Sequence, residues 1–133
     1  MTTTYFLNNI MGNVFTTKTD PTLPINYYIG LSTSAPSLDG SGVSEPASSA
    51  GYARVRLSNL SEPINGVITN QSAVSFEESI SDWGLITHFV IYDSLTGGNL
   101  LMYDALSASR SVEAATVVTI KENSLQLTLA NPT

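Results

Sequence analysis

The sequence predicts a mainly β protein: an antiparallel β-sandwich or flattened barrel of seven to eight short strands, with one N-terminal amphipathic helix. Apolar residues recur at helical spacing only near the N-terminus, and after Pro24 they recur at every second position. Turn-forming residues then separate many short apolar runs. No internal repeat or composition break divides the chain, so we expect a single domain over residues 1–133.

The helix is predicted over residues 4–16. Its apolar residues lie three or four positions apart, and the threonines before them can cap the first turn. An apolar stripe of this kind usually packs in a core or against another subunit. The stripe consists of Phe6, Leu7, Ile10, Met11, Val14 and Phe15.

A strand is predicted directly after Pro24, because Ile25, Tyr27, Ile29 and Leu31 alternate with more polar or smaller residues. Residues 32–51 are then almost all small and turn-forming. We expect them to form a long surface loop, and loops of this length are usually functional or disordered.

Alternation resumes over residues 52–57 and predicts a strand with two distinct faces. One face holds Ala53, Val55 and Leu57, and the other holds Tyr52, Arg54 and Arg56. The dipeptide Asn65-Gly66 then predicts a hairpin turn, and Val74 with Phe76 indicates a short strand.

Two hairpins are predicted in the second half of the chain. In the first, a strand over residues 84–92 turns at Thr96-Gly97-Gly98-Asn99 and returns over residues 100–106. In the second, residues 112–120 and 124–129 pair across a turn at residues 121–123.

The composition excludes several classes of function. Net charge is −6, and the few basic residues are scattered, so nucleic acid is not an expected partner. Without cysteine there are no thiolate metal ligands or thiol nucleophiles, and the apolar runs are far too short to cross a membrane. Nor does the N-terminus resemble a secretory signal. Only 12% of residues are charged, which suits a protein that packs against neighbours in a fixed assembly.

Candidate catalytic residues are few. His88 is the only histidine, and an enzyme using it with Asp82 or Asp93 is one hypothesis. The strand around it is apolar on both faces, so a packing role is favoured. Glu77-Glu78 with Asp82 could form a glycosidase pair, but adjacent acids before a strand more often form a solvated turn.

No metal or cofactor site is predicted. The segment 39–45 was compared with the calcium loop of EF-hands, but Val43 and Ala50 occupy two of the positions that need oxygen ligands. A single histidine without cysteine leaves only carboxylates as further ligands. We therefore interpret this segment as a glycine-permitted tight turn.

The only tryptophan, Trp83, lies between Asp82 and Gly84 at the entry of a strand. A structural interpretation places its indole over one end of the core. The alternative is a carbohydrate-binding module that adheres to a host-surface glycan, in which aromatic rings stack on sugars. Its stacking residues would be Trp83, Tyr27, Tyr28 and Tyr52.

An ordered set of motifs resembles a family of small tailed-bacteriophage virion proteins, labelled tail fibre or phage structural proteins. The resemblance lies in the order and spacing of the motifs over residues 27–106, since each motif alone is unspecific. The motifs are YIGLST (28–33), DGSG (39–42), EP (45–46), GYARV (51–55), DWG (82–84), ITHF (86–89) and TGGNLL (96–101).

The resemblance implies a non-enzymatic structural component of the phage particle, on the tail, collar, baseplate or head. Such a protein would be made in the cytoplasm of the host bacterium and incorporated in the virion. Expected partners are further copies of itself and other virion proteins, with no cofactor. The residues we expect at subunit contacts are Phe6, Ile10, Met11, Val14, Phe15, Leu38 and Val43.

Overall fold

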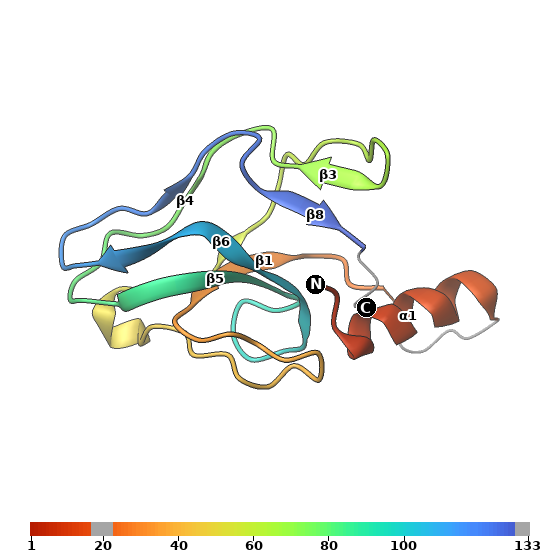
Figure 1. Ribbon diagram of the computed structural model, residues 1–133, viewed down its shortest axis with the longest axis horizontal. Helices are drawn as coiled ribbons and strands as arrows, with labels where there is room; N and C mark the ends of the chain where they lie inside the picture. The colour runs from red at the N-terminus through yellow and green to blue at the C-terminus, as the bar shows by residue number, and fades with distance from the viewer. Residues whose placement is uncertain (17–22, 130–133) are drawn as a thin grey trace.

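The computed structural model describes residues 1–16 and 23–129 and confirms a mainly β, antiparallel architecture with an N-terminal α-helix (Figure 1). A single 3-10 turn, η1 (Ser48–Ala50), accompanies these elements. The helix and strands are α1 (Thr4–Phe15), β1 (Tyr28–Ser32), β2 (Val55–Arg56), β3 (Val67–Thr69), β4 (Val74–Ser75), β5 (Gly84–Tyr92), β6 (Leu100–Val112), β7 (Thr119–Ile120) and β8 (Gln126–Thr128).

The central layer is a four-stranded sheet in the order β2-β1-β5-β6. The inner strand β5 has the predicted bounds, and it pairs with all five residues of β1. β6 continues beyond the predicted residues 100–106, because its second half pairs with the start of β5, Gly84 opposite Val112. β5 is therefore covered on both edges, which agrees with its nearly continuous apolar sequence.

The second layer consists of two short ladders, β3–β8 and β4–β7, on one face of the sheet (Figure 1). The main core lies between the layers, where Ile29, Leu31 and Ile91 of the sheet share one apolar cluster with Phe76 and Leu125. This arrangement is the predicted sandwich, with a second layer that is divided in two.

The predicted second hairpin is wrong, because β7 and β8 pair with different strands instead of with each other. Val112 belongs to β6, and the turn at residues 121–123 carries the chain from one ladder to the next. The buried Asn70 side chain fixes this turn: its amide nitrogen donates to the Lys121 carbonyl at 2.9 Å, and its oxygen accepts from the Leu125 N–H at 3.0 Å. Because the Asn70 side chain satisfies these backbone groups, the residues on either side of the turn need not pair with each other. β7 and β8 can therefore diverge instead of forming a tight hairpin.

The opposite face of the sheet is covered by the loop over residues 32–51 (Figure 1). The loop has no strand, as predicted, but it packs closely on the sheet. Leu38 and Val43 contact a second apolar cluster that contains Val90 and Tyr103. The sheet is thus buried on both faces, on one side by strands and on the other by irregular chain.

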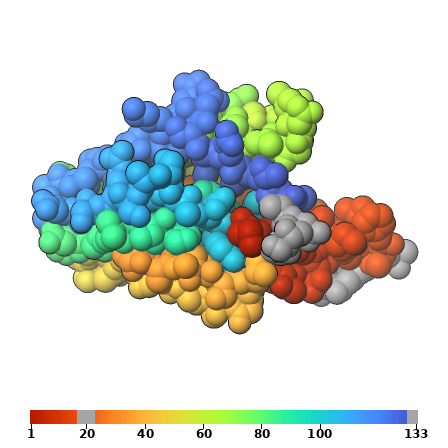
Figure 2. Space-filling view, in the orientation of Figure 1, coloured from red at the N-terminus to blue at the C-terminus, as the bar shows by residue number. Residues whose placement is uncertain are grey.

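α1 begins as predicted and ends one residue earlier than expected. The Thr3 side chain caps it by accepting from the Phe6 N–H at 3.3 Å. The same hydroxyl donates to the Leu100 carbonyl at 2.7 Å, which fixes the start of the helix on β6. Only the first half of α1 contacts the core, through Phe6 and Ile10, and the second half projects from the body (Figure 2).

The predicted faces of residues 52–57 are partly wrong. Only Val55 and Arg56 form a strand, and the buried side chains are Tyr52, Arg54 and Leu57, while Ala53 is exposed. A buried arginine contradicts the simple pattern of apolar residues inside and polar residues outside. Its burial depends on a partner that lies nine residues earlier in the chain.

Candidate functional site

The best-defined polar site in the described chain is a buried ion pair between Arg54 and Glu45 on the loop-covered face of the sheet. The guanidinium Nε donates to Glu45 Oε2 at 3.0 Å, and Nη2 donates to Oε1 at 2.7 Å. The two side chains are 7% and 20% exposed. This is the bidentate geometry in which an arginine fork matches a carboxylate.

Arg54 also fixes the turn between β5 and β6. Its Nη1 donates to the carbonyls of Ser94 at 2.8 Å and Gly97 at 2.7 Å. The guanidinium carbon lies 3.6 Å from the centre of the Tyr92 ring, which is a close cation–π contact. One side chain therefore connects the long loop, the sheet and the β5–β6 turn.

Tyr52 completes the cluster. Its hydroxyl donates to Glu45 Oε2 and accepts from the Leu31 N–H at 2.9 Å. Burial, and next the hydrogen bond to Glu45, raise the pKa of Tyr52 well above its ordinary value, so the phenol stays protonated. A Cβ atom at Gly30 would overlap this hydroxyl oxygen, so the close approach of the cluster favours glycine there.

The cluster explains why motifs that are far apart in the sequence occur together. Gly30 and Leu31 belong to YIGLST, Glu45 to EP, and Tyr52 and Arg54 to GYARV. The turn that Arg54 binds belongs to TGGNLL and the residues before it. These four of the seven motifs thus each supply one part of a single buried site.

A family model described as "Podophage GP4 fiber I protein gp80" matches residues 2–128. The chain belongs to this family. The resemblance to phage fibre-like structural proteins is therefore confirmed, and this gp80 family member is a structural component of a phage virion. No curated protein matches the chain. Within the described residues, no helix is long and apolar enough to span a membrane.

The triad candidates His88, Asp82 and Asp93 each have a separate partner in this gp80 family member. His88 Nδ1 lies 2.8 Å from Thr87 Oγ1, its own neighbour in the chain. Asp82 accepts from the Ala114 N–H at 2.9 Å, and Asp93 accepts from the Asn99 N–H at 2.8 Å. Both carboxylates thus hold backbone turns. Among residues 1–16 and 23–129, no three His, Cys, Asp or Glu side chains are grouped to hold a metal ion.

The aromatic residues considered for sugar stacking do not form an exposed platform. Trp83 is 5% exposed, and its indole N–H donates to the Ala50 carbonyl at 2.9 Å. Tyr52 meets it edge-on and is itself buried in the cluster above. Tyr27 and Tyr28 are half-buried. Stacking on a sugar needs an open ring face, so the structure does not favour the carbohydrate-binding alternative.

The residues expected at subunit contacts divide into three groups. Phe6 is buried and Ile10 is half-buried against the core, and Leu38 and Val43 pack on the protein's own sheet. The outer residues of α1 are the exposed ones: Met11 at 54%, Val14 at 62% and Phe15 at 73%.

An apolar groove of about 590 Å³, which the sequence does not predict, lies beside the base of α1. Segments far apart in the chain form it, so no local pattern marks it. Phe6 and Ile10 of α1 line one part, and Tyr27, Leu57, Leu60 and Leu127 line another.

Gly30→Ala should lower the free energy of unfolding by about 1–3 kcal/mol, because the added methyl group meets the Tyr52 hydroxyl. Tyr52→Phe should also destabilise the protein, since it removes two hydrogen bonds. The double variant should lose less than the sum, because the hydroxyl that the methyl group would meet is gone. Urea unfolding of all four proteins measures this coupling, and additive losses would contradict the proposed contact.

The raised pKa of Tyr52 also predicts a dependence of stability on pH. In the unfolded chain Tyr52 ionises near pH 10, whereas in the folded protein it stays protonated. The contribution of Tyr52 to the free energy of unfolding is thus complete below pH 10. Above pH 10 it decreases by about 1.4 kcal/mol per pH unit. Tyr52→Phe should therefore show a shallower fall in the free energy of unfolding between pH 10 and 11. Equal slopes for both proteins would contradict this assignment.

Proposed function

We propose that this gp80 family member is a non-enzymatic subunit that self-associates and docks on other virion proteins through the end of the molecule that carries α1. The observation that carries the proposal is the projecting second half of α1, which exposes Met11, Val14 and Phe15 (Figure 2). Exposed apolar surface of this extent on a water-soluble fold is typical of a contact that forms in an assembly.

Charge supports association at this end. α1 contains no charged residue, and no residue that lines the neighbouring groove is charged. Elsewhere the chain carries an excess of acidic side chains, with a net charge of −6. Two acidic copies repel each other least where their contact surfaces are uncharged, so the α1 end is the most favourable place for them to meet.

The groove supplies a complementary surface for a second copy of the chain. Its lining is almost entirely apolar, and apolar residues continue around it, with Leu129 exposed at its rim and Ile64 exposed between two lining residues. Helices bind such grooves with apolar side chains spaced three or four residues apart. Met11, Val14 and Phe15 have this spacing. We therefore propose that the outer half of α1 from one copy occupies the groove of another.

Family membership supports a proposal for where the subunit is made and where it ends up. The subunit is made in the cytoplasm of the host bacterium and is then incorporated in the virion. The buried cluster and the two-sided core hold a rigid body, from which α1 extends toward neighbouring proteins. The same surfaces serve contacts with other virion proteins.

A Val14→Glu/Phe15→Glu double variant should abolish self-association, because it places two carboxylates in the proposed apolar contact. Both side chains are exposed, so the variant should keep the circular dichroism spectrum and unfolding midpoint of the unmodified protein. Size-exclusion chromatography with light scattering measures the mass.

Leu85→Glu is the matched control. Leu85 is 51% exposed and is the second residue of β5. This strand begins at the end of the molecule opposite α1 (Figure 1), so the variant should associate normally. The proposal fails if the unmodified protein is a strict monomer at high concentration and is also absent from purified particles by mass spectrometry.

A further inference from the structure

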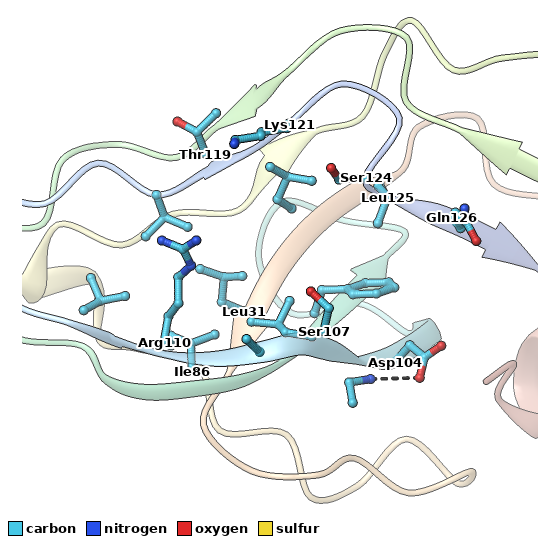
Figure 3. A pocket seen from close by; sticks show the side chains of 17 residues that line it. Leu31, Ile86, Asp104, Ser107, Arg110, Thr119, Lys121, Ser124, Leu125 and Gln126 are labelled. Atoms are coloured by element: carbon cyan, nitrogen blue, oxygen red, sulfur yellow. Dashed lines mark hydrogen bonds between the residues drawn. The ribbon is translucent and has the colours of Figure 1, made fainter.

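A second pocket, of about 460 Å³, opens between β6 and the segment that carries β7 and β8 (Figure 3). Leu31, Ile86 and Leu125 form an apolar floor. Arg110 and Lys121 lie at one end, where the Arg110 side chain rises from β6 toward β7. Ser107 and other hydroxyl-bearing residues line the walls.

The pocket exists because β6 departs from regular pairing. Ile86 pairs with Arg110 and His88 pairs with Ala105, so β6 has residues 106–109 where β5 has Thr87 alone. Apart from Leu106, which packs against the core, the side chains at this bulge are small, and the pocket opens beside them. Polar and charged side chains share the lining of this pocket with apolar residues of the core.

Arg110 and Lys121 are both exposed side chains, and in the described part of the chain they lack the acidic partner that neutralises the buried Arg54. Within residues 1–16 and 23–129, neither side chain forms an ion pair or a hydrogen bond, whereas Arg54 is paired with Glu45. The pocket also contains Asp104, but it lies at the far end and its Oδ1 accepts from the Ala105 N–H at 2.8 Å. Two unpaired cations in an acidic protein form a local attraction for a carboxylate.

The outer edge of β6 is open beside the pocket. Residues 1–3 pair with its first part: the Thr3 N–H donates to the Leu101 carbonyl, and the Tyr103 N–H donates to the Met1 carbonyl, both at 2.9 Å. Beyond Tyr103, no strand in the described part of the chain pairs with this edge. The edge therefore accepts extended backbone already and has room for more.

We propose that this pocket binds an extended acidic segment of a neighbouring protein. The segment continues the antiparallel pairing along β6 and places a carboxylate between Arg110 and Lys121. Backbone pairing supplies affinity and the two cations supply selectivity, as in other cases of strand addition. An acidic saccharide fits less well, because the only aromatic residue in the lining, Phe89, is 9% exposed and offers no stacking face. This contact is separate from the α1 end.

A nuclear magnetic resonance titration of the ¹⁵N-labelled full chain tests the proposal. The probe is the peptide acetyl-Thr-Glu-Val-Glu-Val-Thr-amide, compared with the same peptide carrying Gln in place of Glu. The acidic peptide should shift amide signals of residues 104–112 and 119–126. Binding should weaken at least tenfold with the Gln peptide, and equally with Arg110→Gln.

Two further variants make the test specific. Lys121→Gln should also weaken binding, whereas Arg56→Gln removes an exposed cation outside the pocket and should leave the affinity unchanged. The amide spectrum of each variant without peptide checks that it is folded. The proposal is overturned if millimolar acidic peptide shifts no signals in these segments, or if Arg56→Gln weakens binding as much as Arg110→Gln. It is also overturned if a galacturonate trisaccharide binds there in an Arg110-dependent manner and the peptide does not.

Discussion

The ion pair between Arg54 and Glu45 is the interaction on which the rest of the structure depends. The central sheet is apolar on both faces, and only one of them is covered by strands. The other is covered by a 20-residue loop, residues 32–51, that contributes few apolar side chains. Removing the charges of Arg54 and Glu45 from water is unfavourable. The pair is tolerated because nearly all of its hydrogen-bonding groups have partners: the two side chains bind each other, Arg54 donates to two turn carbonyls, and Glu45 accepts from the Tyr52 hydroxyl. Its role is to select one conformation for a loop whose regular structure is limited to the short 3-10 turn η1.

This constraint divides the molecule into a rigid body and surfaces available for assembly. The cluster holds the loop and the β5–β6 turn against the sheet, so the loop residues Leu38 and Val43 serve the interior. The second half of α1 exposes Met11, Val14 and Phe15. The two cations of the pocket lie elsewhere, Arg110 on β6 and Lys121 just after β7. In the proposed assembly these two surfaces would make separate contacts with neighbouring proteins.

Local patterns in the sequence predict much of the fold but little of the cluster. Strand β5 was predicted with its observed bounds because its apolar run is long and its ends carry turn residues. The partners of β7 and β8 were missed, since pairing between distant strands depends on buried groups such as Asn70 that have no local signature. The alternation groups Arg54 with Tyr52 and Arg56 on one face, but it cannot show that Glu45 will neutralise a buried arginine there. The family motifs contain these residues, but the motifs alone do not explain why they occur together. The structure gives one reason: the Tyr52 hydroxyl lies so close to the backbone at Gly30 that a larger residue would meet it.

Hydrogen exchange of individual amides in Arg54→Met tests the central claim most directly. Methionine keeps much of the side-chain volume but leaves Glu45 without its partner. We expect protection of the Thr33 and Asn99 amides, whose hydrogen bonds lie in the loop and in the β5–β6 turn, to fall at least tenfold, while the Val90 amide in the middle of β5 keeps more of its protection. Unchanged protection of the loop and turn, or an equal loss at all three amides, would contradict the conclusion that this ion pair holds the loop on the sheet.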